Sequence, residues 1–587
     1  MRGRSVLSLT ACLFGIVAAD TGQIPLLAHS GLTLTSGPTS HRGSYNVTTN
    51  LTGANYIFNA LASLLQQLPN NLHPSGHTIV PAIIDAHTLL YHARPVKTGP
   101  PSPEWLAFDA EMSYSIMSGL PWGDGPHLST YAATRDLKVL YFDGESAVLN
   151  GNGALDTQEV VIERKGQVPP PGWGWWDDYG RLDRLCKWKN DSKLYIDGFI
   201  RMNAGFELMW CNFTSGLELI SHLNVTAPDT PPLQEFPFPF PPRRPPTDLS
   251  EGLYDHLSAT GVTTDLNASE DPPYEEAPSR PRRPPWERTR SPYIMTSGYE
   301  WLRIATRRYE APQPHVHLLT SGLLTFYDPQ FTSLVSIRDG SPMSRHRVWA
   351  NVSEEDAVKA VDTLEEIVRR GDDLWTRRGI NWNLIARDVA ENWGDRLAQM
   401  RAALEDNSSE DRNATAQVQQ VRLLAFTLLN PYLDTRNIPL FFNQSDPDEW
   451  LPPTMLRCTT TSTAAIPTAR LTAQEQLLKA SIETVLHNLC QMAGHILVSS
   501  IEAGNKTKEE ELADSWREEV TSMMEWLDWA MWVRCERQCG WNEICAVPTW
   551  PIIGPIGRPG RDQEPSERQK ARCVSYKEWI HQDRRGF

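Results

Sequence analysis

A proline-rich stretch from 227 to 292 divides this chain of 587 residues into two parts that can fold. It contains the run FPFPFPPRRPP and, further on, SRPRRPPWERTRSP. Proline fixes φ and has no backbone N–H, so such a stretch cannot build a packed core. We therefore predict a disordered insert, whose composition is also that of a proline-rich ligand for another protein.

The part before the insert, residues 20–226, has the pattern of an α+β domain. Apolar residues at helical spacing predict a helix from Ile57 that ends at Pro69. Short apolar runs bounded by turn residues follow, as is typical of strands. The predicted strands are 88–92, 105–108, 137–142, 159–162, 195–200 and 206–210.

The part after the insert is predicted to be mostly helical. Residues 293–350 are expected to open with a strand, and a strand at 315–327 is placed to complete the N-terminal sheet. In residues 351–534 apolar side chains recur every three or four positions, as in helices that pack on one another. Ser353 and Thr472 are predicted helix caps, because an acidic residue follows each after three positions.

The N-terminus has the features of a secretory signal peptide, residues 1–19. Arg2 and Arg4 precede an apolar run, and small residues predict cleavage after Ala19. The run has about a dozen residues, whereas a membrane-spanning helix needs roughly 20. We therefore expect no membrane span after cleavage; the alternative is an uncleaved anchor.

Eight cysteines remain once Cys12 is removed with the signal peptide. An even number of cysteines behind a signal peptide favours disulfides, and the C-terminal spacing fits no common zinc pattern, so no metal is expected. We expect Cys186 to pair with Cys211, and the cysteines of a Cys-rich C-terminal region, 535–587, to pair largely among themselves. The eight are Cys186, Cys211, Cys458, Cys490, Cys535, Cys539, Cys545 and Cys573. The predicted fold is thus an α+β N-terminal domain followed by a mostly α-helical, disulfide-stapled C-terminal half.

Asparagines that head an N-x-S/T sequon are far more frequent than chance would give. A sequon can carry an N-linked glycan where it is exposed in the secretory pathway. We therefore expect the chain in the lumen of that pathway or outside the cell. The sequon asparagines are Asn46, Asn50, Asn190, Asn212, Asn224, Asn267, Asn351, Asn407, Asn413, Asn443 and Asn505.

Charge and motifs exclude several classes of function. The formal net charge of -16 argues against nucleic-acid binding. The sequence has no G-x-G-x-x-G that opens a helix, no P-loop, no G-x-S-x-G elbow and no H-E-x-x-H. The signatures of ordinary hydrolases and dinucleotide-binding enzymes are therefore missing.

Two stretches, LLYHAR and PEWLAFDAEMSY, resemble the start of the ADP-ribosyltransferase fold of the His-Tyr-Glu type. The resemblance implies NAD as the substrate, with His92 holding the ribose and Tyr114 stacking on the nicotinamide. It also implies a glutamate that stabilises the oxocarbenium-like centre, which is Glu207 or Glu159 here. Ala93 departs from the family, because a glycine normally follows the histidine and lets the backbone approach NAD.

Two other groups of side chains suggest binding. Trp173, Trp175 and Trp176 lie beside Asp177 and Asp178, and exposed tryptophan with paired acids can bind or cleave sugars. His315 and His317 share one face of a predicted strand, but no third metal ligand lies nearby in the sequence.

The chain also resembles a family of uncharacterised secreted proteins of filamentous fungi. The stretches that carry this resemblance include GHTIVPAIIDAHTLLYHAR, IDGFIRMNAGFELMWC and CERQCGWNEICAVPTWP. Two classes of function therefore stay open. The first is an NAD-using protein of ADP-ribosyltransferase type, active or degenerate. The second is a non-enzymatic extracellular protein that binds a cell-wall carbohydrate or a host protein.

Overall fold

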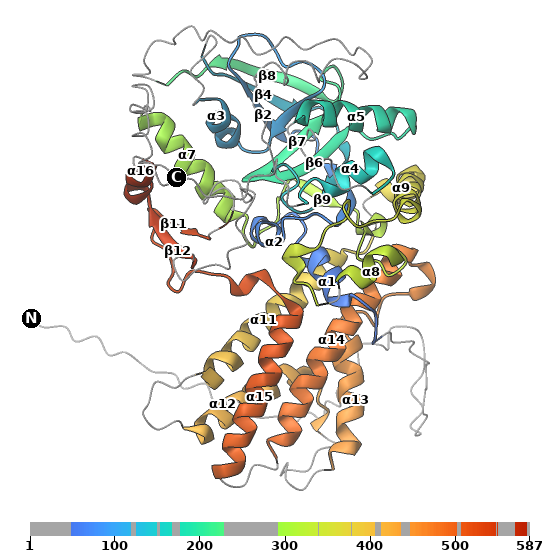
Figure 1. The fold of residues 1–587 in the computed structure, drawn as a ribbon, viewed down its shortest axis with the longest axis vertical. Helices are drawn as coiled ribbons and strands as arrows, with labels where there is room; N and C mark the ends of the chain where they lie inside the picture. The colour runs from blue at the N-terminus through green and yellow to red at the C-terminus, as the bar shows by residue number, and fades with distance from the viewer. Residues whose placement is uncertain are drawn as a thin grey trace, which may run out of the picture.

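The structure is a computed structural model. It describes residues 49–118, 125–148, 153–166, 177–227, 292–338, 340–376, 379–405, 413–435, 446–501, 506–547, 549 and 570–583. A lobe built around a large β-sheet lies on one end of a bundle of long helices (Figure 1). The predicted signal peptide and nearly all of the proline-rich insert lie outside the described residues.

The sheet has the strand order β10-β1-β5-β6-β7-β3-β2-β4-β8, and β9 also pairs with β1. Its pairs are antiparallel except for β5 with β6. The strands are β1 (Thr78–Ile84), β2 (Leu89–Arg94), β3 (Glu104–Ala107), β4 (His127–Ala133), β5 (Leu137–Phe142), β6 (Gly198–Asn203), β7 (Gly205–Trp210), β8 (Leu217–Asn224), β9 (Val316–Leu318) and β10 (Leu324–Thr325). Chain from both sides of the insert thus builds one sheet.

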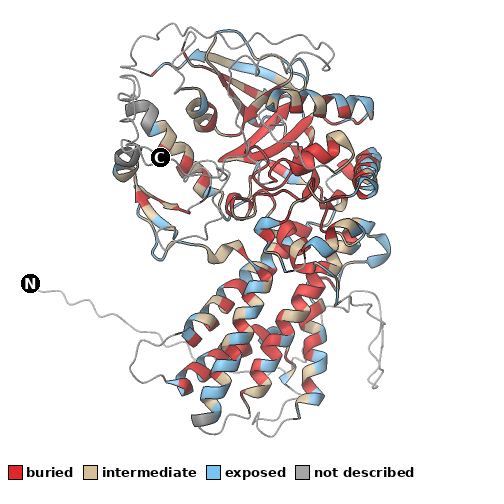
Figure 2. Cartoon of the chain, in the orientation of Figure 1, coloured by how far each residue is buried: buried red, intermediate tan, exposed pale blue. Residues whose placement is uncertain are grey.

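Apolar residues cover both faces of this sheet, which is why β1, with the sequence TIVPAII, is buried at every position. On one face lie α4 (Asp156–Glu163), α5 (Asp178–Asp191) and α9 (Glu354–Arg369). On the other face lies α1 (Ala54–Ala62). The apolar core between α1 and the sheet continues into the helical bundle. Figure 2 shows the buried central strands and the exposed outer surfaces of the helices.

The bundle contains α11 (Trp382–Glu405), α12 (Ala414–Leu429), α13 (Pro447–Thr460), α14 (Ala473–Ser499) and α15 (Lys506–Leu527). Helix α1 packs against α11 and α14, so a helix from the N-terminal part belongs to the core of the bundle. Thr472 and Glu475 form the predicted capping box of α14. Within the described ranges, no helix is both long and apolar enough to cross a bilayer.

Smaller elements complete the fold, and the predicted fold class is confirmed. They are α2 (Gln67–Leu72), α3 (Ala110–Ser118), α7 (Pro292–Arg307), α8 (Thr332–Arg338), α10 (Asp372–Trp375), α16 (Tyr576–Asp583), β11 (Glu543–Ala546) and β12 (Arg572–Ser575). A mixed α+β region is followed by a mostly helical half that contains disulfides.

Three local predictions were wrong. Residues 159–162 belong to helix α4, because buried Asp156 binds Arg347 at 2.8 and 2.9 Å and tertiary contacts outweigh β-propensity. The helix expected to end at Pro69 already ends at Ala62, and Leu65 has a φ of 61° that no helix accommodates. The segment after the insert opens with helix α7 and not with a strand.

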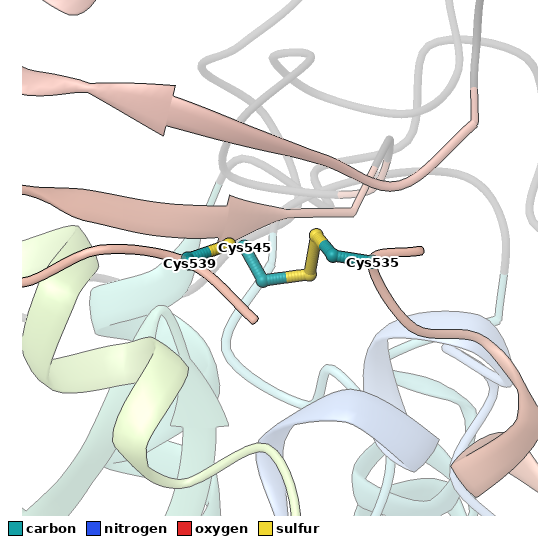
Figure 3. Close-up of side chains that lie close together, drawn as sticks. All are labelled: Cys535, Cys539 and Cys545. Carbon is teal, nitrogen blue, oxygen red and sulfur yellow. A yellow bond between two sulfur atoms is a disulfide. The ribbon is translucent and has the colours of Figure 1, made fainter. Parts of the chain in front are cut away.

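Disulfides join all eight cysteines in pairs. Cys186–Cys211 links α5 to the end of β7, and Cys458–Cys490 links α13 to α14. Cys535–Cys545 and Cys539–Cys573 hold the two-stranded sheet of β11 and β12, and Figure 3 shows the first of these bonds. The pairing expected for Cys186 and for the C-terminal cysteines is thus present in the structure.

Candidate functional site

His92 and Glu207 project from opposite faces of the sheet. Glu207 of β7 lies opposite Ala107 of β3, which lies opposite Tyr91 of β2. Directly opposed residues point to the same side, whereas the next residue along a strand points to the other. His92 therefore points to the face that holds α1, and Glu207 points to the face that α5 covers.

Glu207 is bound in a buried network of ion pairs. Its carboxylate accepts a hydrogen bond from Nε of Arg201, which also donates to both oxygens of Asp178 at 2.7 Å. Burial raises the pKa of Glu207, and the charge of Arg201 offsets part of that rise. The other candidate, Glu159, accepts from Nε of Arg181 at 2.8 Å. Both glutamates are thus held by arginines.

His92 does not share a cleft with Glu207, because the two side chains lie on opposite faces of the sheet. Nδ1 of His92 donates to the carbonyl of Trp105 at 2.6 Å, and burial lowers the pKa of His92 to about 4, so the ring is neutral. Tyr114 is half-buried on α3, which packs against β2 and α7. The structure therefore does not assemble the arrangement that the ADP-ribosyltransferase resemblance implies.

The tryptophan-rich loop falls mostly outside the described residues, which begin again at Asp177. Asp177 caps α5 by accepting from the backbone nitrogen of Gly180 at 3.0 Å. Its neighbour Asp178 belongs to the buried ion pairs with Arg201 and Arg181. Both acids thus have structural roles.

Two groups of potential metal ligands have other partners. Cys535, Cys539 and Cys545 lie close enough together to hold an ion, but their sulfurs are bonded in disulfides and so are not thiolates. His317 pairs at the surface with Asp85, with 2.8 Å between Nε2 and Oδ2. Neither group offers a free set of ligands.

A cavity of about 170 Å³ lies where the sheet lobe meets the helical bundle. Its walls come from α1, α2, the turn before β1, the residue after β5, the end of α7, helix α11 and the 3-10 turn Ala530–Trp532. In Figure 1, α1 and α2 lie between the sheet lobe and the helices of the bundle. The polar lining residues include Asn59, Ser63, Gln66, Asn70, His73, Ser75, His77, Asp143, Glu310, Arg387, Glu391 and Asp528.

A close approach of two backbone segments builds the floor of the cavity. A Cβ atom on Gly76 would lie 2.4 Å from the carbonyl oxygen of Asp143, so only glycine fits there. This contact lets Oδ1 of Asp143 accept hydrogen bonds from the backbone nitrogens of His77 and Thr78, both at 2.7 Å. The end of β5 is thereby fixed to the start of β1.

His77 presents an acceptor atom at this floor. Its Nδ1 donates to the carbonyl of Ser75 at 2.9 Å, and its ring stacks on Tyr327 with centroids 4.3 Å apart. Burial, followed by the charge of Arg338, lowers the pKa of His77 well below its usual value, so Nε2 keeps its lone pair. That nitrogen is buried and has no hydrogen-bond partner among the described residues.

Other polar atoms of the lining are also buried without a described hydrogen-bond partner. They are Oδ1 of Asn59, Oγ of Ser75, both ring nitrogens of His73 and Nε of Arg387. The amide nitrogen of Asn59 donates to the carbonyl of Leu527 at 2.6 Å, which fixes the orientation of the side chain. An unpaired buried polar group costs about 1–3 kcal/mol. These atoms therefore require hydrogen bonds from water or a ligand.

The cavity is acidic at its floor and its rim. Burial raises the pKa of Asp143 to about 7, and the hydrogen bonds from Thr78 and His77 oppose this rise. At the rim, Asp528 lies 3.6 Å from Nε2 of His73, and Glu391 pairs with Arg387 at 3.1 Å. The described lining thus combines unpaired acceptors with the Nε donor of Arg387, a cation that is paired with Glu391.

Sequence reasoning missed this cavity, although one local signal was present. The run from Asn70 to His77, NNLHPSGH, places two histidines, a serine and a glycine directly before a buried strand. The other walls, such as Tyr327 and Asp528, lie hundreds of positions away in the sequence.

Comparisons with known proteins show similarity to uncharacterised proteins. The model of a family described as the YPL277C N-terminal domain matches residues 44–122 and 121–240. Uncharacterized protein YOR389W of Saccharomyces cerevisiae is 26% identical over 546 residues, covering 84% of this chain and 81% of the relative. Uncharacterized protein YPL277C of the same yeast is 26% identical over 418 residues, covering 62% of this chain and 78% of the relative. No solved structure matches.

This protein is therefore an α+β protein with a helical, disulfide-stapled second half, similar to uncharacterised yeast proteins. The matched family residues include the strands from β1 to β8 and the N-terminal walls of the cavity. The names of the relatives supply no reaction, and none of them refers to ADP-ribosyl transfer.

Proposed function

We propose that this chain is an N-glycosylated protein of the secretory pathway or the extracellular space that binds a small, neutral, polyhydroxylated molecule in the cavity between its two lobes. The ligand class is that of a monosaccharide or a polyol. The observation that carries the proposal is the pair of buried, unpaired acceptors, Nε2 of His77 and Oδ1 of Asn59, that line one cavity.

The positions of the sequons support the secretory part of the proposal. Six sequon asparagines are described, and none of them is buried. Asn50, Asn190, Asn212, Asn224 and Asn413 are exposed, and Asn351 is half-buried. An oligosaccharide can reach an asparagine only at the surface, so these positions meet the requirement for glycosylation.

The disulfides support the same location. Four bonds join cysteines from 186 to 573, and two of them hold strands β11 and β12, which share a small apolar core with α7. Such bonds form and persist in oxidising compartments.

The size of the cavity supports a ligand about as large as one sugar ring. An apolar cavity of about 150 Å³ in another protein holds one benzene molecule. The cavity of this chain is of similar size, about 170 Å³. Its lining adds apolar surface from Tyr327, Met343 and Trp529, against which the C–H faces of a sugar can pack.

The chemistry of the lining favours hydroxyl donors. The neutral imidazole of His77 and the amide oxygen of Asn59 both accept hydrogen bonds, and each hydroxyl group can donate one. An anion would be repelled by the carboxylates of Asp528 and Glu391 at the rim. A cation is disfavoured by Arg338, whose guanidinium lies 4.5 Å from the ring centroid of Tyr327. A neutral polyol avoids both penalties and can donate hydrogen bonds to the unpaired acceptors.

Calorimetric titration of the glycoprotein with a panel of sugars and polyols at millimolar concentration tests the proposal. His77→Phe keeps an aromatic ring on Tyr327 but removes the acceptor, so it should weaken binding about tenfold, the loss expected for one hydrogen bond. His92→Phe is the matched control. His92 has the same bonding pattern, with Nδ1 bound to a carbonyl and Nε2 buried without a partner, but it does not line the cavity.

Binding that is weakened by His77→Phe and unchanged by His92→Phe would support the proposal. An equal loss of affinity in both variants would contradict the proposal. So would the absence of measurable binding heat with every sugar and polyol of the panel. Titration with NAD in the same experiment tests the ADP-ribosyltransferase alternative, for which His92→Phe should be the damaging change.

A further inference from the structure

The last strand of the sheet, β8, has an outer edge that pairs with no other strand among the described residues, and it carries exposed apolar side chains. It ends the strand order after β4. Leu219, Ile220 and Leu223 are 52%, 56% and 56% exposed. In Figure 2, β8 is largely exposed or intermediate, unlike the central strands. An open edge of this kind tends to pair with another chain.

Few charged side chains guard this edge. Natural edge strands are usually protected by charges, proline or a bulge. The sequence of β8, LELISHLN, contains one acidic residue, Glu218, and no lysine, arginine or proline. The pairing of β8 with β4 shifts register between Thr130 and Tyr131. This irregularity leaves the apolar side chains of β8 exposed.

Two sequon asparagines bracket the strand. Asn212 lies before β8 and Asn224 is its last residue, and both are exposed. The two have the same local geometry, because Oδ1 of each accepts from the backbone nitrogen and the hydroxyl of the threonine two positions on. These distances are 3.0 and 2.7 Å for Thr214, and 2.9 and 2.6 Å for Thr226. The bonds engage the oxygen of each amide and not the nitrogen to which a glycan is attached.

We propose that N-linked glycans on Asn212 and Asn224 cover the apolar edge of β8 and prevent the chain from associating with itself there. This inference rests on the proposed location, because such glycans are added in the secretory pathway. At each site Nδ2 of the asparagine bonds to the anomeric carbon of an oligosaccharide carried on a lipid diphosphate. The bond from that carbon to the diphosphate breaks, and the amide loses one proton.

The spacing of the two sites fits this role. An eight-residue strand spans roughly 26 Å, at about 3.3 Å per residue. A bulky, hydrated oligosaccharide at each end leaves no uninterrupted length of edge for a second strand to pair with. The glycans thus supply the protection that the side chains of β8 lack.

Light scattering of the secreted protein, with its glycosylated peptides mapped by mass spectrometry, tests the inference. The double variant Asn212→Gln and Asn224→Gln should form particles that contain about twice the polypeptide mass of the monomer or more, because the edge of β8 becomes free to pair. Asn190→Gln is the matched control, since it removes a glycan from α5, away from β8. Endoglycosidase treatment of the folded wild-type protein should cause the same association without any substitution.

Leu219→Lys with Leu223→Lys, added to the glycan-free variant, should restore the monomer. A double glycan variant and a deglycosylated wild type that both stay monomeric would overturn the inference. Occupied sequons elsewhere, with Asn212 and Asn224 unmodified, would overturn it and leave the proposed location standing. A chain without any glycan would overturn both.

Discussion

The backbone nitrogen of His77 donates a hydrogen bond of 2.7 Å to the side chain of Asp143, and this bond joins the start of β1 to the end of β5 at the floor of the cavity. The same carboxyl oxygen accepts from Thr78. Because the Asp143 side chain is buried, two hydrogen bonds do not fully compensate for its lost hydration, and its pKa rises to about 7.

The raised pKa of Asp143 predicts a stability that depends on pH. Between the ordinary value of 3.8 and about 7, the folded protein holds a proton on Asp143 that the unfolded chain has released. The contribution of this group to the free energy of unfolding therefore falls as pH rises through that range. Asp143→Asn removes the titration and keeps an oxygen acceptor. Relative to wild type, the variant should gain stability between pH 5 and pH 8 in urea unfolding.

A constant difference in free energy of unfolding between Asp143→Asn and wild type at the two pH values would contradict this prediction. Buried histidines such as His346, whose pKa is lowered to about 4 by burial, destabilise both proteins equally as pH falls below 6.5. The comparison between variant and wild type therefore isolates Asp143.

The network around Arg201 predicts a structural role for Glu207. Arg201→Met would leave Glu207 buried without its cation and Asp178 with Arg181 alone, and it should lower the free energy of unfolding by about 3–5 kcal/mol. Arg135→Met is the control, because its pair with Asp197 is exposed on the arginine side and should be worth about 0–1 kcal/mol. Chemical denaturation measures the free energy of unfolding of both variants. Similar small decreases in the two variants would show that the buried network is not important for stability.

The disulfide between α13 and α14 should contribute more to the free energy of unfolding than the disulfide Cys535–Cys545. Cys458 and Cys490 are both buried and close a 32-residue separation, whereas Cys535 and Cys545 are 10 positions apart. Replacing the first pair by alanine should cost on the order of 3 kcal/mol, and replacing the second should cost less, since a longer loop restricts the unfolded chain more. Thermal unfolding of the two double variants gives the order, and the reverse order would contradict the assignment.

The sequons predict the mass of the secreted product. Expression in a eukaryotic secretory host should yield a protein well above the calculated 66.2 kDa. Endoglycosidase should return the mass to that of the polypeptide. A product that already has the polypeptide mass before treatment would be incompatible with the proposed location.

Long helices could be predicted from the sequence because their signals are local. Thr472 and Glu475 cap α14 as expected, and Ser353 accepts from the backbone nitrogen of Asp356 at the start of α9. Residues 159–162 were misassigned because Val160 and Val161 favour strands in isolation. Only the distant partners of Asp156 and Glu159, Arg347 and Arg181, reveal why this segment is helical.

The candidate site could not be predicted in the same way. The stacking of His77 on Tyr327 joins the residue before β1 to the second residue after β10, and the whole insert lies between them in the sequence. The pair of His92 and Glu207 failed for a related reason. Motif order suggested one cleft, but strand pairing sets the face of each side chain, and a partner strand is not visible in a local pattern.

A crystal structure of the secreted protein, grown with the tightest-binding sugar or polyol of the panel, tests the central claim most directly. We expect density for one ring-sized ligand in the cavity, with hydroxyl oxygens within about 3.2 Å of Nε2 of His77 and Oδ1 of Asn59. A cavity that holds water alone, with the ligand bound elsewhere on the protein, would contradict it.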